Sequence, residues 1–152
     1  MIKNIFLFLF CFFILNNCGY KPIYSTKNLN FTIGNIEKEN TSLNNEFAKV
    51  IEAIKNNKSN NEINIKIQSD KEITTESKDS KGNALIFELK VKLNVLSVDD
   101  NINKQKNFER KITYKNLNDK FKLRQYEREL EKILITKLVE DLINYFSTSN
   151  DF

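Results

Sequence analysis

The residue with the clearest chemistry in this sequence is Cys18, whose thiol can carry lipid. It follows a short apolar run from Ile5 to Leu15, and Lys3 stands ahead of that run. A basic segment, a short apolar segment and then a cysteine is the layout of a bacterial lipoprotein export signal. The run of about 11 residues is well short of the roughly 20 that a membrane-spanning helix needs. The sequence therefore predicts that residues 1–17 are a removed signal and that Cys18 becomes a lipidated N-terminus.

Two other interpretations of this end stay open, a plain secretory signal and a retained, uncleaved anchor. The secretory signal is disfavoured because Asn16 and Asn17 are not the small residues that its cleavage site needs. Asn17 also departs from the small residue that usually precedes a lipidated cysteine, whereas Leu15 fits its position. A buried core helix is disfavoured because the phenylalanines between residues 6 and 13 would face every direction at once.

The chemistry that the chain lacks excludes most enzyme classes. It holds no histidine, which is the commonest general base and metal ligand. Its two cysteines are Cys11, inside the predicted signal, and Cys18, so the mature body would have no free thiol. Its three glycines, Gly19, Gly34 and Gly82, are too scattered to form a phosphate-binding loop. We expect no catalysis, no metal and no cofactor.

The chain is mildly basic, with a formal net charge of +4 over 152 residues. Asn, Lys and Ile are used heavily, as in proteins from AT-rich genomes. An ordinary solvated surface is the favoured explanation of the lysines, and contact with phosphorylated lipid or a membrane is the alternative. Nucleic-acid binding is disfavoured, because Phe87, Phe108 and Tyr114 fall on the expected apolar faces and would not be available for stacking.

The first third of the body predicts a tether, a strand and a helix. Residues 18–28 contain Gly19 and Pro22 and are interpreted as a tether. Alternating apolar residues predict a strand from Asn28 to Ile36. Next comes a helix that Thr41 or Ser42 would cap. Its apolar stripe has helical spacing and consists of Leu43, Phe47, Val50, Ile51 and Ile54.

Three strands follow, each with a period of two. They cover residues 63–67, 85–95 and 108–114, with a polar loop at 70–83 and a polar turn at 99–106 between them. One side of each strand is apolar, although Arg110 interrupts that side of the last strand. The other sides of the last two strands carry Glu88, Lys90, Lys92, Asn94, Glu109, Lys111, Thr113 and Lys115.

A long helix is predicted from Asn118 to Phe146. Its main apolar stripe is Tyr126, Leu130, Ile133, Leu134, Leu138, Leu142 and Tyr145, widened by Ile135, Val139, Ile143 and Phe146. Such a wide stripe predicts contact with more than one neighbour, and burial within the chain is favoured over a partner chain. The charged residues of the opposite, solvent-facing side are expected to be Arg124, Glu127, Arg128, Glu129, Glu131 and Lys132.

The element order predicts an α+β fold, with two helices packed on one face of a four-stranded, mostly antiparallel sheet in the order β-α-β-β-β-α. The predicted organisation is a signal at 1–17, a lipidated tether at 18–28, a single domain at 29–147 and a frayed tail at 148–152.

The predicted mature end reads CGYKPIY. It resembles the start of LptE, the lipopolysaccharide-assembly lipoprotein family, in the branch that opens Cys-Gly-aromatic-x-Pro-aliphatic-Tyr. The matching residues are Cys18, Gly19, Tyr20, Pro22 and Tyr24. The family is also similar in length and in its two helices on a four-stranded sheet.

The resemblance implies an outer-membrane lipoprotein, held on the periplasmic side by its lipid, that is not an enzyme. It implies a plug inside the β-barrel of LptD that helps the barrel assemble and helps lipopolysaccharide reach the outer leaflet. The alternative is a stand-alone lipoprotein that acts as a chaperone or a structural tether. The candidate contacts with the barrel or with lipopolysaccharide are Lys71, Lys78, Lys81, Lys90 and Lys92.

Overall fold

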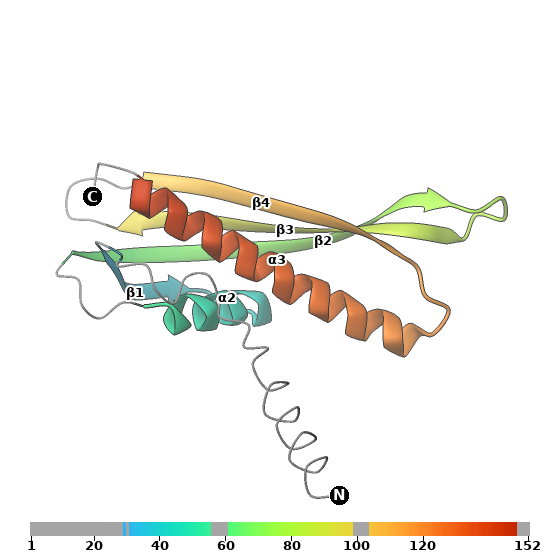
Figure 1. Cartoon of the computed structure of the whole chain (residues 1–152), viewed down its shortest axis with the longest axis horizontal. Helices are drawn as coiled ribbons and strands as arrows, with labels where there is room; N and C mark the ends of the chain where they lie inside the picture. The colour runs from blue at the N-terminus through green and yellow to red at the C-terminus, as the bar shows by residue number, and fades with distance from the viewer. Residues whose placement is uncertain (1–28, 30, 56–60, 99–103, 149–152) are drawn as a thin grey trace, which may run out of the picture.

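The computed structural model describes residue 29 and residues 31–55, 61–98 and 104–148. These residues form elements in the predicted order β-α-β-β-β-α (Figure 1). The elements are β1 Thr32–Lys38, α2 Ser42–Ala53, β2 Glu62–Lys78, β3 Ala84–Val98, β4 Lys104–Lys115 and α3 Lys120–Thr148. Cys18, the predicted signal and the predicted tether lie outside the described residues, and so do residues 149–152 of the predicted tail.

The strands form one sheet in the order β1-β2-β3-β4. β1 is parallel to β2, and α2 is the crossover that this direction requires. β2 pairs antiparallel with β3, and β3 pairs antiparallel with β4. The prediction of a four-stranded, mostly antiparallel sheet is confirmed.

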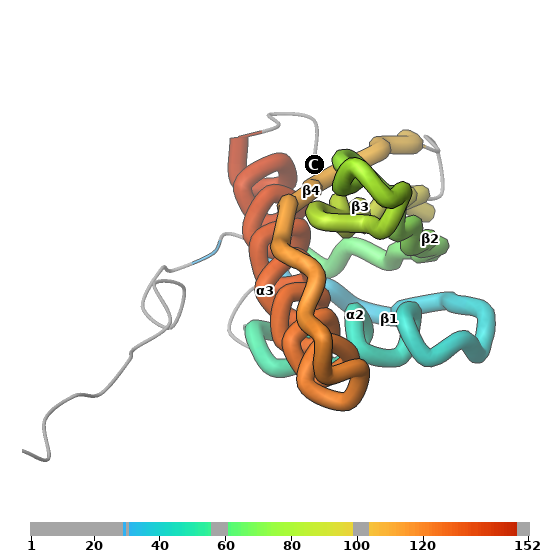
Figure 2. Tube along the Cα trace, turned by 90° about the vertical axis from the view of Figure 1, so that its right-hand side faces the viewer, coloured from blue at the N-terminus to red at the C-terminus, as the bar shows by residue number. Residues whose placement is uncertain are grey.

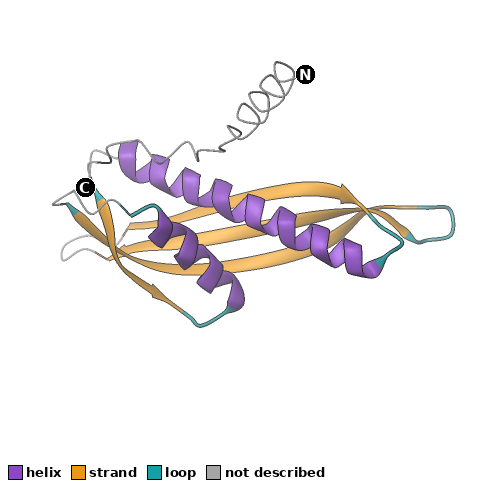
Figure 3. Ribbon diagram, turned by 60° about the horizontal axis from the view of Figure 1, so that its bottom comes forward, coloured by secondary structure: helices purple, strands orange, loops and turns teal. Residues whose placement is uncertain are grey.

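Both helices lie on one face of this sheet, as predicted (Figures 2 and 3). Alternation along the strands explains the single covered face, because successive side chains point to opposite sides. On the covered side, β2 buries Ile65 and Ile67, and β3 buries Leu89, Val91 and Leu93. The helices add their apolar stripes to this layer, and together they form one hydrophobic core.

The start of α2 follows the predicted capping chemistry. The Thr41 hydroxyl accepts a hydrogen bond of 3.2 Å from the backbone N–H of Asn44, so Thr41 is the N-cap and Ser42 is the first helical residue. Phe47 and Ile51, both in the predicted stripe, are fully buried.

The wide stripe of α3 is confirmed in its C-terminal half, where the helix packs against both the sheet and α2. The prediction is wrong for Tyr126 and Ile133, which are 40% and 45% exposed. Near its N-terminus α3 lies beyond α2 (Figure 1), and its buried residues there follow one narrow line along the helix. Leu123 belongs to that line and is buried, although the sequence pattern did not include it.

The predicted polar loop at 70–83 is wrong. β2 continues to Lys78 and β3 begins at Ala84, so these two strands form a long hairpin. Residues 70–78 look like a loop in sequence because this part of β2 extends past α2, where little apolar cover is available. The turn itself is short: Gly82 has a φ of 85°, and the Asp79 carboxylate accepts hydrogen bonds of 2.8 Å from the N–H groups of Lys81 and Asn83.

The boundaries of β4 and β1 also differ from the prediction. β4 begins at Lys104, inside the segment predicted as a turn, because pairing with β3 reaches back to Ser97. β1 begins at Thr32 and continues to Lys38, and its pairing with β2 shifts register between Ile33 and Ile36. That irregularity breaks the alternation that the sequence prediction relied on.

Candidate functional site

One whole face of the sheet has no helix over it in the part of the chain that the structure describes (Figure 3). This helix-free face is polar, apart from Ile86, Leu96 and Val98 near its ends. Its polar members are Asn64, Lys66, Gln68, Asp70, Glu72 and Thr74 on β2, Glu88, Lys90, Lys92 and Asn94 on β3, and Gln105, Asn107, Glu109, Lys111, Thr113 and Lys115 on β4. The predicted polar sides of β3 and β4 therefore do form one continuous surface.

The charges of the helix-free face are arranged to neutralise one another. Lys90 and Lys111 lie directly opposite in the pairing of β3 with β4, which by itself would be destabilising. Lys90 has its ammonium 3.9 Å from Glu72, and Lys111 has its ammonium 2.9 Å from Glu88. The hydrogen bond from Lys111 to Glu88, and the charge of that carboxylate, raise the pKa of Lys111. The surface is thus strongly polar but mixed in sign.

The candidate lysines do not form one cluster. Lys90 and Lys92 lie on the helix-free face, where Lys92 is in register between Asp70 and Glu109. Lys71 lies on the opposite face, and its ammonium is 2.8 Å from the carboxylate of Glu131 on α3. Lys78 and Lys81 lie at the tip of the β2–β3 hairpin. These positions separate a sheet-face pair from a hairpin-tip pair.

A second surface, the distal end, consists of the hairpin turn at 79–83, Leu85 and residues 116–122. Asn116 joins its parts, because its backbone N–H and side-chain amide donate to the carbonyls of Leu85 and Ala84, at 2.9 and 2.8 Å. Large apolar side chains are exposed here: Leu85 is 49%, Leu117 36% and Phe121 65% exposed.

The same stretches of chain and the strand ends beside them carry exposed lysines, and they are Lys78, Lys81, Lys115, Lys120 and Lys122. Sequence reasoning placed Leu85 on the apolar side of its strand and gave Leu117 and Phe121 no role. The sequence did carry one signal for Leu117 and Phe121, because both are large apolar residues that lie outside the main stripe of the predicted long helix. The distal end combines apolar and cationic groups, as a surface for an anionic amphiphile would.

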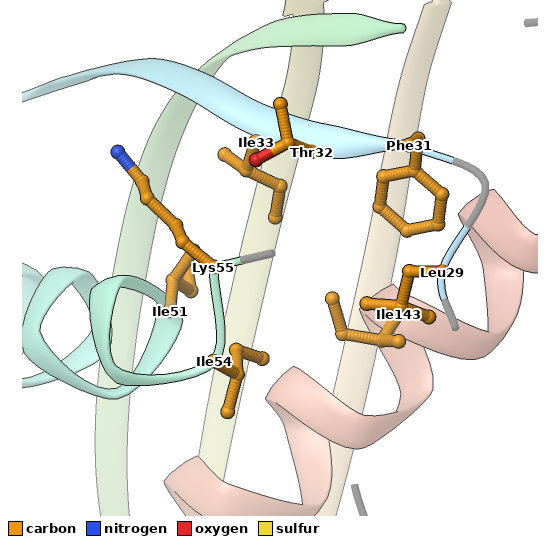
Figure 4. Close-up of a pocket in the computed structure, with 8 residues that line it drawn as sticks. All are labelled: Leu29, Phe31, Thr32, Ile33, Ile51, Ile54, Lys55 and Ile143. Atoms are coloured by element: carbon orange, nitrogen blue, oxygen red, sulfur yellow. The ribbon is translucent and has the colours of Figure 1, made fainter. Parts of the chain in front are cut away.

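The opposite end of the molecule is where the described chain begins. β1 pairs with the first residues of β2, far from the hairpin turn (Figure 1). The rings of Phe31 and Phe146 meet edge to face with centroids 5.7 Å apart. Figure 4 shows that the small depression here is lined mainly by apolar side chains of β1, α2 and α3, while the Lys55 ammonium binds the Gly34 carbonyl at 2.7 Å. This end, here called the anchor end because the predicted tether precedes it in the sequence, closes the core.

Polar contacts along α3 fix its position on the sheet. Arg110 binds Asp141, Tyr114 donates to Glu127 at 2.7 Å, and Lys71 binds Glu131. Burial, followed by the bond to Glu127, raises the pKa of Tyr114. The prediction that Glu127 and Glu131 belong to the solvent-facing side of the helix is wrong, because both contact the sheet. Arg110 interrupts the apolar side of β4 because Asp141 lies opposite it.

The described residues contain no cluster of three or more side chains that could hold a metal ion. Among the same residues, neither helix has the length and apolar character of a membrane span.

Comparison with known proteins gives structural neighbours but no sequence match. No protein-family model and no curated protein matches the chain. The fold is similar to rare lipoprotein B from Shewanella oneidensis, with a TM-score of 0.56, 15% identity and coverage of 76% of this chain and 95% of that one. It is similar to an uncharacterized lipoprotein B from Nitrosomonas europaea (TM-score 0.59, 16% identity, 85% and 90% covered). A minor lipoprotein from Acinetobacter baumannii is also similar, with a TM-score of 0.56, 14% identity and coverage of 76% of this chain and 90% of that one. The chain shares the fold of these lipoproteins.

Proposed function

We propose that this chain is an LptE-like lipopolysaccharide-assembly lipoprotein of the outer membrane. In this role its domain occupies the lumen of an LptD-type β-barrel, helps that barrel assemble and helps lipopolysaccharide reach the outer leaflet. Lipid on Cys18 holds it on the periplasmic side. The resemblance at Cys18–Tyr24 and the shared fold of the lipoprotein B structures support this proposal.

The observation that carries the proposal is the helix-free face. Barrel lumens are polar, so a plug needs a rigid surface with donors and acceptors and little net charge. The mixed pairs Lys90–Glu72 and Lys111–Glu88 give the face that character.

The two ends suggest how the plug is oriented. Leu29, the first described residue, lies at the anchor end, and the distal end lies at the far side of the domain (Figure 1). Lys78 and Lys81 would meet lipid A phosphates there as point charges. The exposed Leu117 and Phe121 would contact acyl chains.

Affinity purification of the full chain from outer membranes in mild detergent tests the role. A plug should bring down a large β-barrel protein in equal amount. A stand-alone lipoprotein should bring down no stoichiometric partner. Depletion of the chain should also lower surface lipopolysaccharide, and normal barrel assembly after depletion would contradict the proposal and favour the stand-alone role.

A charge reversal tests the helix-free face itself. Lys90→Glu with Lys92→Glu should weaken co-purification of the barrel, because surface charges set association more than fold. The matched control is Lys132→Glu with Lys137→Glu on the exposed side of α3. A swap, Lys90→Glu with Glu72→Lys, retains the local pair but inverts its pattern. The swap should keep the melting temperature and still weaken co-purification.

A further inference from the structure

The two edges of the sheet differ because β1 is much shorter than its neighbour. β1 has 7 residues and β2 has 17, and their pairing ends at Lys38 and Ile67. Beyond that point β2 continues as the edge of the sheet (Figure 1). Its other side stays paired with β3 up to the hairpin turn.

Past the end of β1, the side chain of Asn44 pairs with the next outward-facing residue of β2, which is Ser69. The side-chain oxygen of Asn44 accepts hydrogen bonds from the Ser69 N–H at 2.9 Å and from the Ser69 hydroxyl at 2.6 Å. The amide nitrogen of Asn44 donates to the Glu39 carbonyl at 3.1 Å, and Asn44 is only 1% exposed. The Ser69 N–H therefore points away from β3, towards the open edge.

The outward orientation of the Ser69 N–H recurs at every second residue along β2. In an antiparallel pair, every second residue turns its N–H and C=O away from its partner strand. Counting from Ser69, these are Lys71, Ile73 and Thr75, up to the register shift after Thr75. No described residue makes a backbone hydrogen bond with these three on the open side. An edge of this kind is a template for another strand.

The side chains beside this edge favour a particular partner. On the helix side, Ile73 is 44% exposed next to the buried Leu89, and the Lys71 ammonium is already occupied by Glu131. On the other side, Asp70 and Glu76 are exposed carboxylates, and Glu72 is only loosely paired with Lys90 at 3.9 Å. On the helix side the edge thus offers one exposed apolar side chain, Ile73, between Lys71 and Thr75, and on the other side it offers carboxylates.

We propose that the edge of β2 from Lys71 to Thr75 binds an extended strand of a partner protein. The bound strand carries apolar side chains against Ile73 and basic side chains against Asp70, Glu72 and Glu76. Strand addition uses backbone hydrogen bonds for affinity and alternate side chains for specificity. A second copy of this chain fits poorly, because antiparallel self-pairing centred on Thr74 would place Glu72 opposite Glu76. The proposal does not depend on a barrel partner.

A synthetic nine-residue peptide of alternating valine and lysine serves as the probe, with the full chain in detergent micelles. Without peptide, the amides of Lys71, Ile73 and Thr75 should exchange with solvent quickly, whereas those of Glu72 and Thr74, which face β3, should exchange slowly. Peptide should slow exchange at the first three by at least tenfold. A valine–glutamate peptide should not slow exchange at these three amides. A valine–lysine peptide that is N-methylated at every second residue should not slow it either.

Variants separate edge binding from general charge attraction. Asp70→Lys with Glu76→Lys should weaken binding of the valine–lysine peptide at least tenfold. Glu129→Lys, on the exposed side of α3, should leave it unchanged. Equal binding of the N-methylated peptide, or unchanged exchange at Ile73 with peptide bound, would overturn the proposal. A dimeric chain whose edge amides are protected without peptide would also overturn it.

Discussion

The guanidinium of Arg110 on β4 donates two hydrogen bonds of 2.7 Å to the carboxylate of Asp141 on α3. The hydrogen bonds, and then the charge of Asp141, raise the pKa of Arg110. This pair ties the outer strand of the sheet to the helix that covers it. The two side chains are 49% and 28% exposed, so solvent screening reduces the strength of the pair.

Arg110→Ala should lower the free energy of unfolding by about 1 kcal/mol, the upper range for a partly exposed pair with two-point geometry. Chemical denaturation measures this. Asp141→Ala should cost a similar amount, and the double variant should cost little more than either, because one interaction is lost in each case. Fully additive effects would show that the two residues act independently.

Leu134→Ala should lower the free energy of unfolding by about 2–5 kcal/mol, because the side chain is removed from a closely packed core. Leu134 is 3% exposed, whereas Ile133 beside it is 45% exposed. Ile133→Ala is therefore the matched control and should change stability by less than about 1 kcal/mol. Thermal melting of both variants checks this, and similar losses would mean that α3 is rotated from its position here.

The hairpin turn should respond to acid through Asp79. Hydrogen bonds, first from the Asn83 side chain and then from backbone N–H groups, lower the pKa of Asp79 below its ordinary 3.8. A lowered pKa means that the charged form is favoured when folded. The stabilisation is therefore complete above the ordinary pKa and is lost as the pH falls through the lowered value.

An NMR titration of the Asp79 carboxyl and of the Lys81 and Asn83 amides measures this effect. The amide signals should shift together with the carboxyl at a pH below 3.8. In Asp79→Ala they should not follow that titration. An ordinary or raised pKa for Asp79 would contradict the turn geometry.

Cys18→Ala should release the mature domain from membranes or stall its processing, because a single acyl chain anchors only marginally and stable anchoring needs two. Cys11→Ala, inside the predicted signal, is the control and should leave anchoring unchanged. Intact mass of the membrane-purified protein measures the modification directly. An unmodified Cys18 would refute the predicted lipidation.

The sequence was sufficient for the order and type of the elements, because their periodicity is strong. The alternation of Ile63, Ile65 and Ile67 and the stripe of α2 each reflect a face buried against one layer. Such patterns depend only on local geometry and on which side is dry. The capping of α2 by Thr41 is local in the same way.

Features that depend on distant neighbours were not predictable in this way. Residues 70–78 form a strand because β3 pairs with them, and no period of their own records that partner. Ile133 fits the stripe of α3 but is exposed, because it lies on the same side of the helix as the exposed residues Tyr126 and Lys137, away from the sheet and α2. Glu131 resembles a solvent-facing helix residue until Lys71 is placed opposite it.

The candidate site shows the same division. The polar sides of β3 and β4 were predictable as a shared surface, because alternation fixes which residues share a face. The approach of the β4–α3 connection to Leu85 was not, since it depends on the hydrogen bonds by which Asn116 contacts Ala84 and Leu85. The open edge of β2 was not predictable either, because it depends on the residue at which β1 ends.

The difference in length between β1 and β2 divides the domain into two regions of unequal cohesion. In one region the sheet, α2 and α3 pack against each other, and Ile51, Ile67 and Leu142 are buried there. Past Ser69 the sheet has only α3 beside it, and the hairpin then extends beyond that helix as well. Fewer buried contacts mean a smaller free energy of local unfolding. We therefore expect the distal half to open and re-form as a separate cooperative unit while the half that contains β1 and α2 remains folded.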